Sequence, residues 1–362
     1  MIPHLGGGGA EQVTEILATN LSQEKYEVHL GLVSRSVYDE GRLPEWVTVH
    51  CLESRRVRGA AFKLVKLIWQ LRPAVILSGM AHLNLLVLML RLFFPPRTLV
   101  LVRQNATVSS ALNFGSLPGY TGLLYRIFYR RADFVICQSE AMAADLCAAI
   151  CMPHAKVAVL LNPVDLDGIR AAVANAPNQW SWIGPNLLAF GRLSYEKGFD
   201  LLLEAFAALL ADYPGASLTI AGEGACRADL GAQAAALGIE AKVRFLGHID
   251  SPACYFPGAS LLVVSSRHEG MPNAMLEAAA AGLPIVSMPA SQGMVDLLQD
   301  HPGIWVAGDI SAHALYSALG TALKTLKPGE RFAHEWINQF RAGVAIKTYE
   351  DLIDTTMDGW AP

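Results

Sequence analysis

The chain has 362 residues, of which 52% are hydrophobic and 17% are charged. This length suggests two domains, and the apolar content is ample for two cores and excludes an intrinsically disordered chain. The 28 basic and 32 acidic residues give a net charge of −4, which argues against a dedicated nucleic-acid-binding protein. Six scattered cysteines form no CxxC pair and no disulfide framework, so we expect buried free thiols in a reducing, cytoplasmic compartment.

Short apolar runs alternate with longer segments of helical period, which is the pattern of repeated βα units and parallel sheets. The apolar stretch 74–90 is shorter than the roughly 20 residues of a membrane-spanning helix and contains polar residues, so we expect a buried strand followed by a buried helix. In the first half the expected strands are 27–33, 47–51, 74–78, 98–103, 133–138 and 156–161, and the expected helices are 10–22, 60–71, 82–93, 119–131 and 140–150.

The pattern is lost over 162–182, where Pro163, Pro177 and several asparagines occur, and it resumes at residue 186. We therefore predict two doubly wound, Rossmann-like α/β domains, over 1–165 and 186–340, joined by a linker over 166–185 and facing each other across a cleft. Ligands bind such sheets at the carboxyl ends of the strands. In the second half the expected strands are 186–191, 216–221, 242–246, 260–265, 283–287 and 303–307.

Charge is unevenly distributed along the chain. Residues 54–132 contain 12 basic residues and no acidic residue, which indicates an anionic partner for the first half. Two segments of this region, 55–72 and 123–131, mix cations with apolar and aromatic side chains. Basic amphipathic helices bind anionic membrane surfaces, although an ordinary helix with its apolar stripe in the core has the same pattern. We expect peripheral contact with the cytoplasmic face of a membrane.

Four glycines, residues 6–9, lead directly into a helical pattern. Glycines before a helix let backbone N–H groups approach an anion, and the helix N-terminus adds a partial positive charge. A plain turn is an equally good interpretation. The segment is neither a P-loop, because Gly-Lys-Ser/Thr is missing, nor a dinucleotide-binding fingerprint.

The segment FGRLSYEKGFD follows an expected strand and opens a helix. It carries two cations, Arg192 and Lys197, five residues apart. At the carboxyl end of a parallel strand this pair is suited to bind a diphosphate, because Arg contacts two oxygens at once and Lys supplies a compact charge. A solvated surface pair is the alternative.

The segment SSRHEGMPNAMLEA contains two glutamates, Glu269 just before an expected helix and Glu277 within it. Pro272 suits the first helical turn, and we expect the N–H groups over 270–274 to form a second anion site. Paired carboxylates also occur in glycoside hydrolases. However, a carboxylate beside a helix N-terminus stays ionised and donates protons poorly, so accepting hydrogen bonds from hydroxyls suits both residues better.

With seven residues between its glutamates, EGMPNAMLEA resembles the signature of glycosyltransferase family 4, whose members have the GT-B fold. The segment GRLSYEKGFD resembles that family's Arg/Lys diphosphate motif, and GGGGAE resembles its donor-proximal N-terminal loop. NPVD, AGEGACR and RFLGHID also fall in the expected order. The likeness covers nearly the whole chain and is strongest over 186–290.

The resemblance implies a retaining transfer of a sugar from a nucleoside diphosphate donor, with UDP favoured over GDP. It implies a glycan or lipid-linked acceptor, as in surface polysaccharide or glycolipid synthesis, and no cofactor or tightly bound metal. Arg192 and Lys197 would neutralise the departing diphosphate, while Glu277 would bind ribose hydroxyls. Glu269 would position the sugar or stabilise its positive charge, and the last helix, 341–362, would return to the first domain. The other expected donor-binding residues are Gly8, Gly9, Gly191, Gly222, Gly247, His248, Gly270, Met271, Pro272 and Asn273.

Two features depart from the family pattern. Family members begin with a full strand before the glycine loop, whereas only residues 1–5 precede it here. We expect either a true start upstream of Met1, which we favour, or a stunted central strand. Many members also carry a sugar-contacting His after the fourth strand of the first domain, where this chain has Asn105. Asn can hydrogen-bond but cannot act as an acid or base. On the acceptor side His82 could substitute, although a packed or surface His is the simpler interpretation.

Two other functions remain open. A nucleotide-sugar epimerase of the same fold would share the diphosphate site, but it would need acid and base groups at the sugar, which are scarce here. A catalytically weakened nucleotide-sugar-binding relative is suggested by the shortened start and the missing His.

Overall fold

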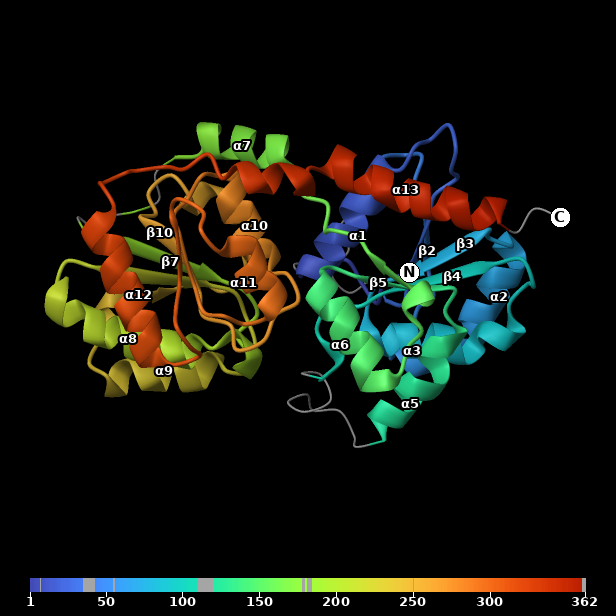
Figure 1. Cartoon of the computed structure of the whole chain (residues 1–362), viewed down its shortest axis with the longest axis horizontal. Helices are drawn as coiled ribbons and strands as arrows, with labels where there is room; N and C mark the ends of the chain where they lie inside the picture. The colour runs from blue at the N-terminus through green and yellow to red at the C-terminus, as the bar shows by residue number, and fades with distance from the viewer. Residues whose placement is uncertain are drawn as a thin grey trace. The chain divides into compact units, whose positions relative to one another are not determined.

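The computed structural model describes residues 1–6, 8–34, 43–54, 56–109, 120–177, 180, 184–249 and 251–359. The chain forms two compact units, each with a parallel sheet and helices (Figure 1). The first unit contains Met1–Val164 and Gln339–Pro362, and the second contains Asp165–Asn338.

The first unit contains a two-stranded and a four-stranded parallel sheet, between which the first residues of the chain lie. The amide of Ile2 donates to the carbonyl of Gly31 at 3.0 Å, and the amide of Gly79 donates to the carbonyl of Met1 at 3.3 Å. The first two residues therefore connect the two sheets, and Ile2 forms a parallel bridge with Leu32. The strands are β1 (His29–Leu32) with β2 (Thr48–Cys51), and β3 (Val75–Ser78), β4 (Leu99–Arg103), β5 (Phe134–Cys137) and β6 (Val157–Val159) in sheet order β3-β4-β5-β6.

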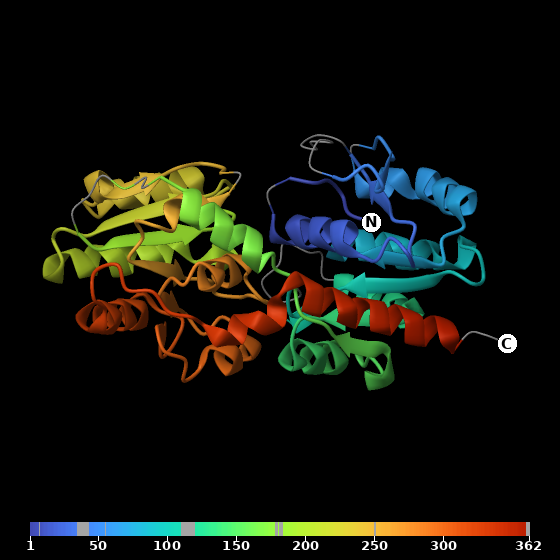
Figure 2. The ribbon, with the colours of Figure 1, turned by 90° about the horizontal axis from the view of Figure 1, so that it is seen from above.

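Helices cover both faces of the four-stranded sheet (Figures 1 and 2). Because strand residues alternate between faces, Val100 and Val102 of β4 join one apolar cluster and Leu101 joins the other. The first cluster includes residues of α2 (Ala61–Leu71), α3 (Ala81–Leu90), α5 (Thr121–Phe128) and α6 (Glu140–Ile150), and the second includes residues of α1 (Gly9–Asn20) and α13 (Ala342–Asp358).

Helix α13, the last helix of the chain, is held on the first unit by a buried arginine. Arg103 at the end of β4 donates from Nε to the hydroxyl of Tyr349 in α13, at 3.0 Å, and from Nη2 to Asn162 Oδ1, at 2.7 Å. Val164 and Arg341 form a parallel bridge where the chain leaves the first unit and returns to it. Arg103 is 2% exposed, so it is not available to an anionic partner. The expectation that the basic residues over 54–132 serve such a partner is therefore wrong for Arg103.

The second unit has one six-stranded parallel sheet of order β12-β11-β10-β7-β8-β9. The central apolar cluster packs α8 (Phe199–Asp212), α9 (Arg227–Ala236) and α12 (Ala312–Thr325) against this sheet. The helices α10 (Asn273–Ala280) and α11 (Gln292–Leu298) complete the unit. The strands are β7 (Asn186–Phe190), β8 (Ser217–Ala221), β9 (Val243–Phe245), β10 (Leu261–Val264), β11 (Ile285–Ser287) and β12 (Ile304–Val306).

The first part of the predicted linker, 166–185, forms a regular helix, α7 (Leu166–Asn175). This helix belongs to the second unit. The side chain of Asp165 caps this helix by accepting from the amide of Gly168 at 2.9 Å. Arg170 Nε donates to the carbonyl of Ala280 in α10, at 3.3 Å. The apolar pattern missed α7 because Leu166 is its one buried residue.

Two other expectations concern the apolar stretch 74–90 and the cysteines. Within the described ranges no helix is both long enough and apolar enough to cross a membrane, and the stretch 74–90 forms β3 and α3 as predicted. The six cysteines are free. The prediction that they are buried is right for Cys137 and wrong for Cys151, which is exposed, while the other four are intermediate.

Candidate functional site

Glycines bring three loops together at the carboxyl ends of the second unit's strands. A Cβ on Gly222, after β8, would lie 1.9 Å from the carbonyl oxygen of Gly191, after β7, and Gly222 has a φ of +138°. The amide of Gly222 donates to the carbonyl of Gly247, after β9, at 2.7 Å, and Gly247 has a φ of +73°. Side chains at these positions would force the loops apart or strain the backbone. The glycines therefore fix the edge of the sheet where we expect the donor.

Gly198 allows the loop after β7 to lie against the loop after β10, its neighbour in the sheet. Its φ is +62°, and a Cβ there would lie 2.0 Å from the carbonyl oxygen of Ser265. The hydroxyl of Ser265 in turn donates to the carbonyl of Lys197, at 2.9 Å. These contacts place Lys197 beside the segment that carries Glu269.

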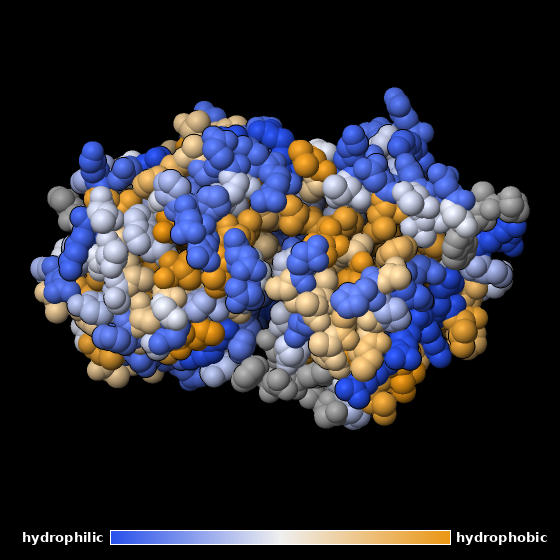
Figure 3. Space-filling view, in the orientation of Figure 1, coloured by the Kyte–Doolittle hydropathy of each residue, from blue (hydrophilic) through white to orange (hydrophobic). Residues whose placement is uncertain are grey.

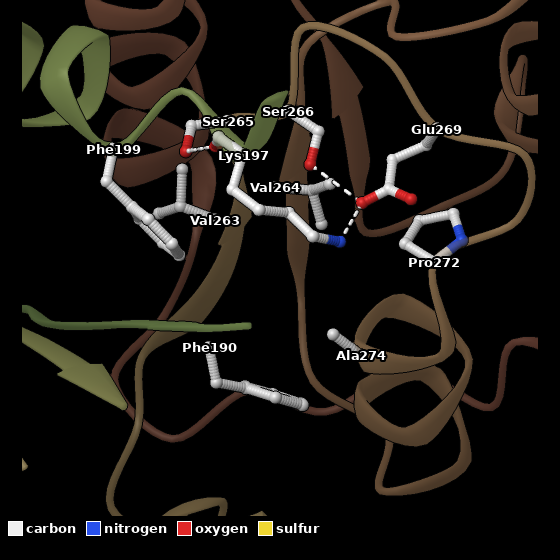
Figure 4. A pocket seen from close by; sticks show the side chains of 10 residues that line it. All are labelled: Phe190, Lys197, Phe199, Val263, Val264, Ser265, Ser266, Glu269, Pro272 and Ala274. Carbon is white, nitrogen blue, oxygen red and sulfur yellow. Dashed lines mark hydrogen bonds and ion pairs between the residues drawn. The ribbon is translucent and has the colours of Figure 1, made fainter. Parts of the chain in front are cut away.

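Figure 4 shows the side chains of Lys197, Ser266 and Glu269 converging on one another. Nζ of Lys197 donates to Oε1 of Glu269 and forms an ion pair with it, and Ser266 Oγ donates to the same oxygen at 3.0 Å. The Lys197 and Glu269 side chains are 24% and 13% exposed. Two donors thus hold one carboxylate oxygen, while Oε2 of Glu269 has no hydrogen bond to any residue that the structure describes. A small pocket beside them is lined by Phe190, Phe199, Val263, Val264, Pro272 and Ala274.

An arginine that sequence reasoning missed braces these two loops. Arg267 donates from Nη1 and Nη2 to the two carboxylate oxygens of Asp200, at 2.7 and 2.5 Å. Nη1 also donates to the carbonyl of Tyr195, at 2.8 Å, and the guanidinium lies 4.1 Å from the centre of the Tyr195 ring. The amide of Arg267 donates to the carbonyl of Glu196, at 2.8 Å. One residue therefore ties the loop that carries Lys197 to the loop that carries Glu269.

Burial and the positive charge of Arg267 shift the pKa values of two nearby residues, Asp200 and His268. Burial by itself raises the pKa of Asp200, but the hydrogen bonds and positive charge of Arg267 outweigh burial and lower that pKa. Burial, assisted by the positive charge of Arg267, lowers the pKa of His268. The Asp200 carboxylate is therefore ionised at neutral pH, and the His268 imidazole is held neutral there.

The turn after Glu269 leads into α10 and is largely buried. Gly270, Met271 and Pro272 are buried, and Asn273, the first residue of α10, is half-buried. Glu277 lies in α10 and is 7% exposed. A buried carboxylate is stable when it is paired or hydrogen-bonded, so Glu277 is held within α10, one turn after the helix begins beside the pocket.

Two predicted site residues of the second unit, one catalytic and one donor-binding, lie at its surface. Arg192, on the same loop as Lys197, is exposed, and its guanidinium has no hydrogen bond to the residues described here. His248, which follows Gly247, is also exposed. The structure therefore brings Lys197 and Glu269 together, and the Arg192 guanidinium forms no hydrogen bond or ion pair with either.

In the first unit the predicted glycines begin α1. Gly8 is the N-cap residue and Gly9 the first helical residue. A Cβ on Gly8 would lie 2.2 Å from Oε2 of Glu11, whose side chain is buried. Glu11 is the third helical residue, a position where an acidic side chain interacts favourably with the helix N-terminus. Its spacing from the glycines is the signal that could have identified it from the sequence.

The two acceptor-side candidates occupy different positions. His82 is the second residue of α3, and partial burial of its ring, together with nearby His4, lowers its pKa. Asn105 follows β4, and its amide nitrogen donates to the carbonyl of Gly79. The side-chain oxygen of Asn105 accepts from Nε2 of Gln138, at 3.2 Å. Asn105 thus links the ends of three neighbouring strands, and its oxygen keeps the capacity for one more hydrogen bond.

Two family models match successive parts of the chain. Residues 7–167 match the model described as Glycosyltransferase Family 4, and residues 184–325 match the model described as Glycosyl transferases group 1. The two matched segments fall in the first and the second structural unit, apart from the short overlap at 165–167.

Individual proteins also resemble the chain over part or all of its length. An uncharacterized glycosyltransferase from Haemophilus influenzae is 36% identical over 31% of this chain and 32% of its own length. The lipopolysaccharide core biosynthesis glycosyltransferase LpsE from Rhizobium meliloti is 30% identical over 44% of this chain and 45% of its own. The chain thus spans less than half the length of either relative.

Among solved structures, Anabaena HepE in complex with UDP and glucose matches with a TM-score of 0.77. The match covers 98% of this chain and 99% of HepE at 17% identity, and it shows the fold. With both halves of the chain matched by glycosyltransferase models and the whole chain by this fold, the protein belongs to glycosyltransferase family 4 and has the GT-B fold.

Proposed function

We propose that this protein is a retaining glycosyltransferase that transfers a sugar from a nucleoside diphosphate donor to a glycan or lipid-linked acceptor, in surface polysaccharide or glycolipid synthesis at the cytoplasmic side of a membrane. The observation that carries the proposal is the Lys197–Glu269 pair at the carboxyl ends of β7 and β10. LpsE, named for lipopolysaccharide core biosynthesis, supports the acceptor class. HepE, solved with UDP and glucose, supports UDP over GDP as the nucleotide.

The cations act on the leaving group. When the bond between the sugar and the diphosphate breaks, negative charge grows on the departing phosphate oxygens. Fixed positive groups lower the barrier most when they meet charge that is greatest in the transition state. Lys197 is held in place by Glu269 and by the braced loop, whereas Arg192 is exposed and can reach a ligand by changing rotamer. We propose that this pair neutralises the diphosphate without a tightly bound metal or other cofactor.

The carboxylates act on the sugar and the ribose. Glu269 Oε1 is occupied by Lys197 and Ser266, and Oε2 accepts nothing from the described residues, so Oε2 can accept from a sugar hydroxyl or face the anomeric carbon. A carboxylate there stabilises the positive charge that develops on the sugar ring. Glu277, buried in α10, would accept hydrogen bonds from the ribose hydroxyls.

Radiolabelled UDP-sugars and GDP-sugars, incubated with the protein in water and then with a lipid-linked or glycan acceptor, test the proposal. A transferase releases free sugar slowly in water and forms a product with the donor's anomeric configuration, which NMR identifies. An epimerised donor would show the epimerase, and binding without turnover would show a binding-only relative. Lys324→Met, an exposed lysine of α12, is the matched control for Lys197→Met.

A further inference from the structure

Exposed apolar side chains are concentrated on one part of the first unit. Of the twelve large apolar side chains that are exposed among the described residues, eight lie between residues 62 and 127. They belong to α2, to α3 and the short turn after it (Arg91–Phe93), and to α5 and the residue that precedes it. Single exposed apolar residues are ordinary, but a contiguous group marks a binding surface.

Helix α2 has two apolar faces. Leu64 and Ile68 are buried in the core, as an ordinary two-sided helix requires. Phe62 and Trp69 lie on the outer face, with 80% and 48% of their surface exposed, and Lys66 lies between them at helical spacing. Packing in the core therefore explains why Leu64 and Ile68 are apolar, but it does not explain the apolar side chains on the outer face.

The outer faces of α2 and α5 belong to one surface. Trp69 Nε1 donates to the carbonyl of Phe93 at 2.8 Å, which joins α2 to the turn after α3, where Leu92 and Phe93 are 74% and 62% exposed. On α5, Leu123 and Ile127 are 59% and 47% exposed, one helical turn apart. Helices α2, α3 and α5 pack into one core cluster, so they cover the same side of the sheet. In Figure 3 strongly hydrophobic and strongly hydrophilic atoms adjoin over the α2 and α5 end of this unit.

Unbalanced cations accompany these apolar groups. Arg103 is buried and Arg91 pairs with Asp133, so neither contributes. The exposed cations that remain include Lys63, Lys66, Arg72, Arg126 and Arg130, and residues 54–132 contain no acidic side chain to neutralise them.

We propose that this α2–α5 surface, formed by Phe62, Lys66, Trp69, Phe93, Leu123 and Ile127, docks on an anionic lipid bilayer. Lysine and arginine would contact lipid phosphates while phenylalanine and leucine enter the acyl boundary and tryptophan stays at the interface. A second copy of the chain is a poor occupant, because it would oppose cations with cations. A nucleic acid would leave the leucine and isoleucine side chains without an apolar partner. Docking goes beyond sugar transfer and does not depend on it.

The test is flotation with vesicles of phosphatidylcholine, with and without phosphatidylglycerol, and a gel-shift arm with a short DNA duplex. The protein should float with the anionic vesicles alone, and binding should weaken as salt rises from about 0.02 M to about 0.5 M, because screening shortens the Debye length. One cation near the membrane surface strengthens partitioning of the protein onto anionic vesicles about fivefold, and insertion of Phe62 strengthens it further. Phe62→Ser with Lys66→Gln should therefore weaken partitioning at least tenfold. Ile310→Ser with Lys324→Gln, an equally conservative pair on the second unit, should leave it unchanged.

Trp69 supplies a second measurement. Brominated lipids should quench part of the tryptophan emission of the wild-type protein, and Trp69→Phe should remove that part. Absence of flotation at low salt, equal loss in the Phe62/Lys66 and Ile310/Lys324 variants, or tighter binding to DNA than to anionic vesicles would each overturn the proposal. Because flotation requires no turnover, an inactive protein that floats refutes the transferase function and leaves the docking surface standing.

Discussion

Lys197→Met removes the cation that the structure holds most firmly at the proposed leaving group. In the wild-type protein Nζ of Lys197 is bound to Glu269, and the loop that carries it is tied by Ser265 and Arg267. Loss of one preorganised group that stabilises developing charge costs about 2–4 kcal/mol of barrier, by analogy with an oxyanion-hole donor. This corresponds to a fall of about 30- to 900-fold in kcat. Arg192→Ala should act in the same direction.

The assay is steady-state donor hydrolysis and transfer, with binding of uridine measured in parallel. Binding of uridine should weaken far less than kcat falls, since the nucleoside contacts remain and uridine carries no diphosphate. Lys324→Met controls for the loss of a lysine, and circular dichroism controls for folding. A double-mutant cycle with Glu269→Gln should show coupling, because the two side chains share a contact. If both Lys197→Met and Arg192→Ala kept kcat within about threefold of wild type, the transition-state argument would be wrong.

Three further variants test the other parts of the site. Glu277→Gln should mainly raise the donor KM, because a ribose contact is common to ground and transition states, whereas Glu269→Gln should mainly lower kcat; identical kinetic profiles would remove the basis for separate roles. Gly222→Ala should destabilise the protein by about 3 kcal/mol or more, since a Cβ meets backbone at 1.9 Å, and an unchanged Tm would contradict this. The lowered pKa of Asp200 supplies stability that is fully present above the ordinary value of 3.8 and is lost as the pH falls through the lowered value, and Asp200→Asn should remove this stability. In urea unfolding the difference between wild type and Asp200→Asn should therefore shrink as the pH falls below about 4, and a difference that stays constant would refute the pairing with Arg267.

The regular elements were predictable because local patterns specify them. Continuous apolar runs such as 74–78 and 98–103 became β3 and β4 with bounds shifted by at most one residue at each end. Helix α7 escaped prediction because its stability depends on the cap at Asp165 and on contacts with α10, and an apolar stripe is nearly absent. The existence and the ends of most helices and strands therefore follow from local sequence patterns. A helix such as α7 is missed where tertiary contacts stabilise it in place of an apolar stripe.

The site was predictable in its members but not in its contacts. Lys197 and Glu269 lie 72 positions apart, and their meeting depends on β10 pairing with β7, a neighbour relation that periodicity does not reveal. The same holds for Arg267 and Asp200, which no local pattern connects. Composition likewise counted Arg103 and Lys66 as equivalent cations, although one is buried and the other exposed.

The position of α13 has a consequence for biosynthesis. Ile346, Tyr349 and Ile353 of this helix pack against Leu101 and Ile136 of the first unit's sheet, yet they are translated after the entire second unit. At about 5–20 residues per second, the roughly 190 residues from the first exit of the chain to the end of α13 take on the order of 10–40 s to synthesise. The second unit, continuous in sequence, has all its strands before α13 leaves the ribosome. The nascent first unit meanwhile presents an apolar sheet face that α1 covers only in part, so this face is a candidate site for chaperone binding during translation.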